Sequence, residues 1–199
     1  RYAASDPNWS PGRKSTSDSA PLLHHVRVVR EAHWLFGLQP DQIEVLIHPQ
    51  QAVHGMVYLR DGSVLAQLAG ADMRTPISYA LAWPERLHWA ETRLDLAALG
   101  KLSFEAVDMQ RFPCFALARQ ALRDGVAAPA ILNAANEVAV DAFLKGKIGF
   151  TRIAAIVDTV LGQSASAQID SLEAVMAIDA ASRDLALTAV TKNQSYLSD

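Results

Sequence analysis

The sequence predicts an α+β fold, in which a mainly antiparallel sheet with helices precedes a carboxy-terminal helical bundle. Between residues 43 and 68, short runs rich in β-branched residues alternate apolar and polar side chains, a pattern typical of paired strands. After residue 110, apolar side chains recur at helical spacing, which indicates amphipathic helices that pack on one another. Hydrophobic residues make up 50% of the 199 residues, which suits a globular core.

Three strands are expected in the first region. An apolar run at 43–47 should end before Pro49, which cannot donate to a sheet ladder. A second strand is expected at 53–60 and a third at 64–68. Asp61-Gly62 between them predicts a hairpin turn, because glycine tolerates the positive φ that such turns need. One face of the second strand would carry Val53, Gly55, Val57 and Leu59.

Helices dominate the rest of the chain. Thr75 to about Trp83 should be helical, since Pro76 suits the first turn, where its missing N–H does no harm. Residues 87–110 are expected to form an irregular connector with a short strand at 101–106. Four helices should follow, each with an apolar stripe. These stripes comprise Phe115, Ala118, Ala121 and Leu122; Ile131, Ala135, Val138 and Ala142; Ile153, Ile156, Val157, Val160 and Leu161; and Leu172, Val175, Met176 and Leu185.

Two polar segments have more than one interpretation. Asn133, Asn136 and Glu137 indicate either a polar site or hydrogen bonds between helices. Residues 1–20 have the composition of a loop, in which Trp9 is an aromatic that can pin the loop to the core. Asp18 or Ser19 can cap the helix that follows, and a hydroxyl beside helix-start N–H groups also suits an anion.

Composition and charge exclude several classes of partner. The net charge of −3 and the lack of a Lys/Arg block argue against nucleic acid. No apolar run approaches the roughly 20 residues of a membrane span, and no signal-peptide pattern opens the chain, so we expect no membrane contact. Cys114 is the single cysteine and cannot form an internal disulfide, which fits a cytoplasmic protein.

Several long, ungapped motifs resemble one enzyme family, the 1-deoxy-D-xylulose 5-phosphate reductoisomerases of the non-mevalonate isoprenoid pathway. The resemblance covers nearly the whole chain, but only the later half of such an enzyme. It is carried by Pro7-Asn8-Trp9-Ser10, His48-Pro49-Gln50, His54, Asp61-Gly62-Ser63-Val64-Leu65-Ala66-Gln67, Asp72-Met73-Arg74-Thr75-Pro76-Ile77, Ala82-Trp83-Pro84-Glu85-Arg86 and Leu132-Asn133-Ala134-Ala135-Asn136-Glu137.

The resemblance implies a reaction, cofactors and a domain plan. Family members convert their sugar-phosphate substrate to 2-C-methyl-D-erythritol 4-phosphate with NADPH and Mg²⁺ or Mn²⁺, and they are homodimers that pair through their sheets. By analogy, residues 1–20 would be a lid loop, 21–110 part of the catalytic domain, and 111–199 the helical bundle. We expect the amino-terminal NADPH domain, with two acidic metal ligands, to be absent from these 199 residues, which contain no Gly-x-Gly-x-x-Gly.

The resemblance also implies roles for individual residues. Trp9 matches a lid residue that covers the substrate, and Ser19 matches a serine that binds the phosphate. His54 matches a histidine near the active site, and Met73 a methionine near the nicotinamide pocket. For Met73 without a cofactor domain, core packing is the alternative. His48 is expected to be structural.

The chain departs from the family pattern where the ligands are expected. Family members have Asn and Lys where this chain has His24 and His25, and a metal-binding Glu where it has Val28. Valine has no lone pair and cannot bind Mg²⁺ or Mn²⁺, whereas a protonated His25 would partly replace the Lys charge. At the front of the lid, Asp6 stands for a family His and Pro11 for a family Met.

These departures leave three hypotheses open. The first is the carboxy-terminal part of a reductoisomerase that is inactive alone. The second is a non-catalytic remnant that keeps the fold as a binding or dimerisation module. The third is a new histidine metal site, although His25 and His33 are eight residues apart and a helical zinc pair prefers three or four.

Overall fold

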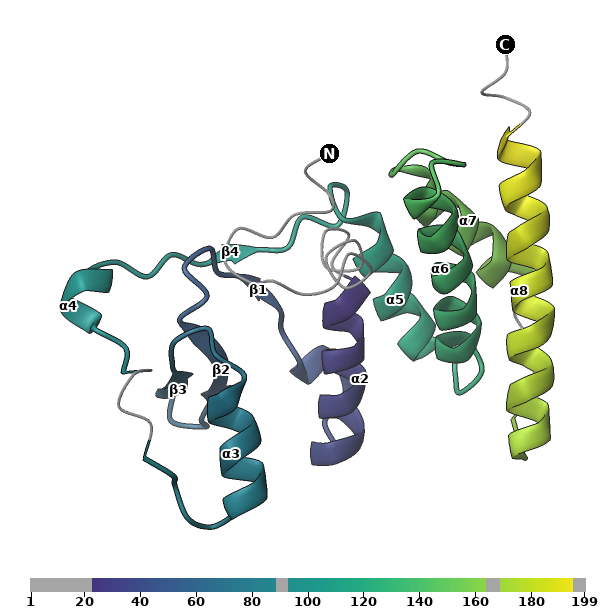
Figure 1. The fold of residues 1–199 in the computed structure, drawn as a ribbon. Helices are drawn as coiled ribbons and strands as arrows, with labels where there is room; N and C mark the ends of the chain where they lie inside the picture. Colours follow the sequence, from purple (N-terminus) through teal and green to yellow (C-terminus); the bar gives the residue numbers. More distant parts are fainter. Residues whose placement is uncertain (1–22, 89–92, 164–168, 195–199) are drawn as a thin grey trace. The chain divides into compact units, whose positions relative to one another are not determined.

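A computed structural model describes residues 23–88, 93–163 and 169–194 (Figure 1). The chain divides into two compact units. The helical unit contains the described residues up to Glu44 and those from Asp108 onward, and the hairpin unit is Val45–Val107. No helix within the described ranges is long and apolar enough to cross a membrane.

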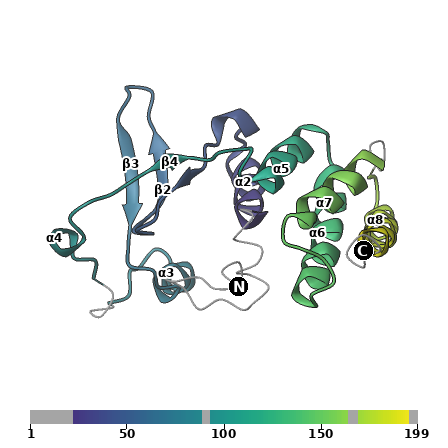
Figure 2. The same ribbon diagram turned by 90° about the horizontal axis from the view of Figure 1, so that it is seen from above.

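Four helices of the helical unit form the expected bundle: α5 (Pro113–Arg123), α6 (Ala128–Leu144), α7 (Arg152–Gln163) and α8 (Leu172–Gln194). Helix α6 packs against α5, α7 and α8 (Figures 1 and 2). It takes this place because apolar and small residues cover most of its circumference, so it can be buried on several sides. The buried residues of α6 are Ile131, Leu132, Ala134, Ala135, Asn136, Ala139, Val140 and Ala142.

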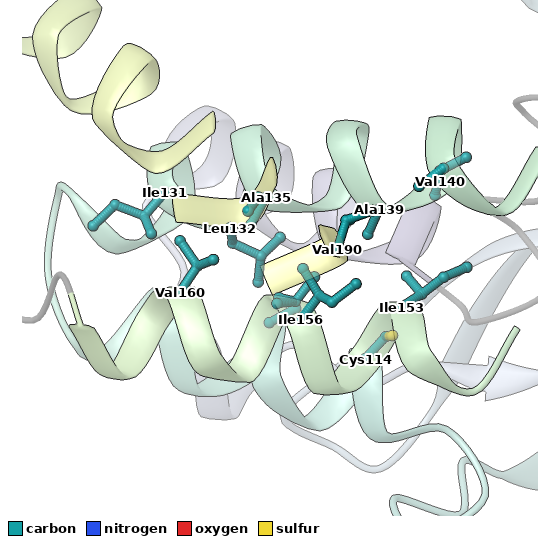
Figure 3. Close-up of a cluster of buried hydrophobic side chains, with 14 of the residues drawn as sticks. Cys114, Ile131, Leu132, Ala135, Ala139, Val140, Ile153, Ile156, Val160 and Val190 are labelled. Carbon is teal, nitrogen blue, oxygen red and sulfur yellow. The ribbon is translucent and has the colours of Figure 1, made fainter. Parts of the chain in front are cut away.

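The bundle core confirms three of the predicted stripes. On α7, Ile153, Ile156, Val157 and Val160 are each at most 1% exposed. All four belong to one apolar cluster with residues of α5, α6 and α8, in which Figure 3 shows Ile153, Ile156 and Val160. A helix with buried side chains every three or four residues gains most of its stability from such packing rather than from helix propensity.

The stripe expected on α8 is partly wrong. Leu172 is 71% and Met176 is 66% exposed, whereas Ser182 and Ala186 are buried. Helix α8 carries apolar residues on two sides, so the pattern alone did not decide which side faces the core. The side with small residues is buried, because small side chains let two helix backbones approach closely.

Helix α2 (Leu23–Phe36) and the 3₁₀ turn η2 (Pro40–Gln42) complete the helical unit, and both contact α5. The Asp41 carboxylate accepts a hydrogen bond from Arg123 Nη2 at 2.7 Å, and Arg119 Nη2 lies 3.7 Å away. The Arg123 hydrogen bond holds the pKa of Asp41 below its ordinary value. Both side chains are exposed to solvent, so this ion pair links η2 to α5 but contributes little to the free energy of unfolding.

Strands β2 (Val53–Tyr58) and β3 (Val64–Leu68) form the predicted antiparallel hairpin (Figure 2). Gly62 has a φ of 85°, which confirms the reason for a glycine at this turn. The Asp61 carboxylate accepts hydrogen bonds from the backbone N–H and the hydroxyl of Ser63 at 2.9 and 2.6 Å. These local bonds fix the turn and therefore the register of the hairpin.

A bulge at His54 changes the expected faces of β2. Val53 pairs with Leu68 and Gly55 pairs with Gln67, so two steps along β2 correspond to one step along β3. One extra residue in a strand shifts the alternation of all the residues beyond it. The prediction that Val53 shares one face with Gly55, Val57 and Leu59 is therefore wrong. Val53 and Met56 are the half-buried residues of β2.

The second sheet is shorter than expected. Strands β1 (Leu46–Ile47) and β4 (Glu105–Ala106) pair antiparallel, so only the ends of the predicted strands 43–47 and 101–106 form a ladder. The hairpin unit also contains α3 (Arg74–Ala82), as expected, and α4 (Leu96–Leu99), which was not expected. The Asp95 carboxylate begins α4 by accepting hydrogen bonds from the N–H groups of Ala97 and Ala98.

Candidate functional site

Helix α2 carries the three positions that depart from the family pattern. His24 and His25 lie in its amino-terminal part, and their side chains are outside the described set. Val28 is 48% exposed. The first turn of α2 has no acidic residue. The carboxylate nearest in sequence is that of Glu31, an exposed residue one turn beyond Val28, and Val28 itself has no ligand atom. The side chain at position 28 therefore does not fit the role of a ligand for a divalent metal ion.

The other candidate metal ligands do not compensate for this. Among the side chains that the structure describes, no three His, Cys, Asp or Glu residues come together to hold a metal ion. His33 Nδ1 is hydrogen-bonded to the Leu38 carbonyl, and its ring meets Trp34 edge to face. Burial raises the pKa of Cys114 to about 12, so its thiol stays protonated near neutral pH and is a poor ligand and nucleophile.

A tight turn at residues 48–51 of the hairpin unit is held by backbone and side-chain hydrogen bonds. The Gln51 N–H donates to the His48 carbonyl at 3.1 Å. Two side chains then tie the turn to Ser103: His48 Nδ1 donates to its carbonyl at 2.8 Å, and Gln50 exchanges hydrogen bonds with its hydroxyl and N–H, both at 3.1 Å. The His48 ring stacks on Phe104, with centroids 4.7 Å apart. His48 has the structural role expected for it.

His54 follows this turn as the extra residue of the β2 bulge. Its side chain is exposed, and Nε2 lies 3.0 Å from the carbonyl oxygen of Gln51. Bulges commonly re-aim a side chain next to a functional site. Sequence reasoning singled out His54 but missed Gln51, because nothing in a His-Pro-Gln-Gln run indicates that a glutamine has a φ of 51°.

Met73 lies at the start of α3 and is 53% exposed, so it does not serve as a core residue within this unit. Beside it, Asp72 and Arg74 form an ion pair in which Arg74 Nη2 donates to the carboxylate at 2.6 Å. The Arg74 hydrogen bond holds the pKa of Asp72 below its ordinary value. Trp9, Ser19 and the loop 1–20 lie outside the described residues.

The polar residues of α6 favour a link between helices. Arg183 of α8 donates to Glu137 at 2.8 Å and to Asp179 at 2.6 Å. These two carboxylates hold the pKa of Arg183 above its ordinary value. Asn136 is 5% exposed within the bundle. Of the two interpretations of Glu137, hydrogen bonding between helices is the one that the geometry supports.

Comparison with known proteins gives one consistent result. Residues 68–185 match the family profile of the DXP reductoisomerase C-terminal domain. The chain is 57% identical over 181 residues to the 1-deoxy-D-xylulose 5-phosphate reductoisomerase of Cupriavidus metallidurans, and 56% identical over 181 residues to that of Ralstonia nicotianae. Each alignment covers 91% of this chain and 46% of the relative.

Solved structures resemble most of this chain. A DOX-P reductoisomerase in complex with NADPH, fosmidomycin and magnesium has a TM-score of 0.89 at 43% identity, covering 95% of this chain and 48% of that one. The enzyme from Zymomonas mobilis in complex with NADPH has a TM-score of 0.85 at 44% identity, covering 89% and 47%. The chain therefore spans about half the length of the relatives it matches.

Proposed function

Because this chain belongs to the 1-deoxy-D-xylulose 5-phosphate reductoisomerase family, we propose that it is the carboxy-terminal part of such an enzyme. The complete protein would convert the sugar phosphate to 2-C-methyl-D-erythritol 4-phosphate with NADPH and a divalent metal ion, in the cytoplasm. The observation that carries this proposal is the family match over residues 68–185. The metal and the NADPH in related structures are bound by those proteins, and their transfer to this chain belongs to the proposal.

The proposed site uses the residues that match the family. Trp9 would cover the substrate, Ser19 would bind its phosphate, His24 and His25 would face the substrate in place of Asn and Lys, and His54 would lie beside it. Met73, exposed at the start of α3, would meet the nicotinamide. The matching functional domains would be the lid 1–20, the partial catalytic domain 21–110 and the bundle 111–199.

We expect these 199 residues alone to show no metal-dependent turnover. Val28 offers no metal ligand, and no dinucleotide-binding glycine motif occurs in the sequence. The reaction needs a metal ion to polarise the substrate oxygens, and Val28 cannot help to bind one. It also needs a nucleotide-binding domain to deliver hydride, and these residues carry no motif for one. The measurement is NADPH oxidation with 1-deoxy-D-xylulose 5-phosphate and Mn²⁺. Turnover that disappears when the metal is chelated would contradict the expectation.

The hairpin unit exposes apolar side chains that a second copy of the chain would cover. Val57, Val64 and Leu65 on the hairpin are 45–63% exposed, and all five residues of β3 are exposed. A two-stranded hairpin without a covered face is marginal in water, and an exposed strand edge pairs readily with another strand. We therefore propose a homodimer that forms through this hairpin, as the family resemblance also implies.

Replacing Leu65 by Lys is expected to convert this dimer to monomers, because a charge would be buried in an apolar interface. Light scattering after size exclusion should give twice 21.6 kDa for the unmodified chain and 21.6 kDa for the variant. The matched control is Val126→Lys, since Val126 is 68% exposed but lies in the helical unit. A monomeric unmodified chain, or a Leu65→Lys dimer, would contradict the proposed interface.

A non-catalytic remnant is the second candidate function. The observation that favours it is that helix α2 is kept, whereas its position 28, which holds a metal-binding Glu in the family, is Val28. Such a protein would act as a binding or dimerisation module. The upstream genomic sequence discriminates the two: a reading frame for a dinucleotide domain with acidic ligands supports the enzyme, and its absence supports the remnant.

A further inference from the structure

Two backbone carbonyls hold two histidines of the hairpin unit in opposite tautomers. A carbonyl oxygen only accepts hydrogen bonds, so the ring nitrogen that faces it must carry the hydrogen. His48 faces the Ser103 carbonyl through Nδ1 at 2.8 Å, and His54 faces the Gln51 carbonyl through Nε2 at 3.0 Å. A neutral His48 therefore has its lone pair at Nε2, and a neutral His54 has its lone pair at Nδ1.

The Gln51 carbonyl reaches His54 because of an unusual backbone conformation. Gln51, with a φ of 51°, is the only residue other than glycine that has a positive φ in the described ranges. Such a conformation is uncommon for a residue with a Cβ. It persists here because the turn is fixed on both sides, by the bonds of His48 and Gln50 to Ser103 and by the hairpin that begins at Val53.

We propose that Gln51 is a positioning residue, which fixes His54 so that Nδ1 is a hydrogen-bond acceptor for a hydroxyl of the substrate. No hydrogen bond joins His54 Nδ1 to another residue in the part of the chain that is described. The ring is exposed, and it stands on the bulge of a hairpin whose turn is closed by local hydrogen bonds. This inference rests on the proposed function, since the polyhydroxylated ligand is the sugar phosphate assigned there.

The first test determines the tautomer of each ring by NMR of the full chain labelled with ¹⁵N-histidine, at a pH of about 8.5, where a free imidazole is neutral. A fixed tautomer gives two well-separated ring nitrogen resonances, whereas exchange between tautomers draws them together. His54 should carry its hydrogen on Nε2 and His48 on Nδ1. The Nδ1 resonance of His54 should then shift on addition of 1-deoxy-D-xylulose 5-phosphate but not of inorganic phosphate.

Two variants separate the role of Gln51 from that of the fold. Gln51→Gly keeps both the carbonyl and the positive φ, so the His54 resonances should not change. Gln51→Val disfavours that φ, so the two His54 resonances should move together while those of His48 report an intact turn at Ser103. A sugar phosphate that has no effect would count against the proposed substrate and leave the positioning by Gln51 standing. A hydrogen on Nδ1 of His54 in the unmodified chain, or unchanged His54 resonances in a folded Gln51→Val variant, would overturn the positioning itself.

Discussion

Replacing His24, His25 and Val28 by Asn, Lys and Glu is expected to raise the rate of NADPH oxidation at least about a thousandfold in a joined protein. The joined protein has the amino-terminal half of the Cupriavidus metallidurans relative placed before this chain. The added half would supply the nucleotide domain and the two acidic ligands that the family resemblance implies. The three substitutions would supply the remaining donors on α2. A metal that polarises the substrate oxygens contributes several kcal/mol to the transition state, and this contribution is what the chain lacks at Val28.

The control for this gain keeps Asn and Lys at positions 24 and 25 but replaces Val28 by Leu. Leucine fills the helix surface without providing an oxygen, so any difference from the Glu variant reports the carboxylate alone. Since Val28 is 48% exposed, neither substitution disturbs a packed core. The account fails if the joined protein is already fully active with the natural His24, His25 and Val28.

In the bundle, Ile156→Ala is expected to lower the free energy of unfolding by about 2–5 kcal/mol. Ile156 is 1% exposed and belongs to the same apolar cluster as Leu132 and Val190 (Figure 3). Removing most of its side chain loses the transfer free energy of the buried methyl groups and leaves a cavity between helices. The midpoint of urea unfolding, followed by the helical circular dichroism signal, measures the loss.

Two further variants calibrate that measurement. Ile156→Val removes one methylene group and should cost about 0.5–1.5 kcal/mol. Asp158→Ala changes an exposed residue of the same helix and should stay within about 0.5 kcal/mol of the unmodified chain. An Ile156→Ala variant as stable as Asp158→Ala would show that α7 does not pack as described.

Local patterns predicted most of the secondary structure. The stripe on α7 and the glycine turn at Gly62 each depend on a few neighbouring residues, and both are confirmed. The strand at 43–47 was overestimated because a ladder needs a partner, and only Leu46 and Ile47 find one. The buried face of α8 was misassigned at Leu172 and Met176, because the choice between two apolar faces is made by the neighbouring helix.

The sequence predicted the properties of the candidate site only where the identity of a residue is sufficient to decide its chemistry. Val28 is informative because valine lacks a ligand atom wherever it lies. His54 was identified by resemblance, but its tautomer depends on the Gln51 carbonyl, and therefore on a backbone angle that propensity does not encode. The bulge that places His54 is set by the pairing of Val53 with Leu68 and of Gly55 with Gln67. The register between two strands depends on contacts between them, and the alternation of residues within one strand does not reveal it.

Mn²⁺ binding to the joined protein, followed by electron paramagnetic resonance, tests most directly whether position 28 decides the metal site. With His24→Asn and His25→Lys in place, the Val28→Glu variant should bind Mn²⁺ at least about a hundredfold more tightly than the protein that retains Val28. Equal affinity of the two proteins would contradict the account, because the metal would then be held without any ligand from this position of α2.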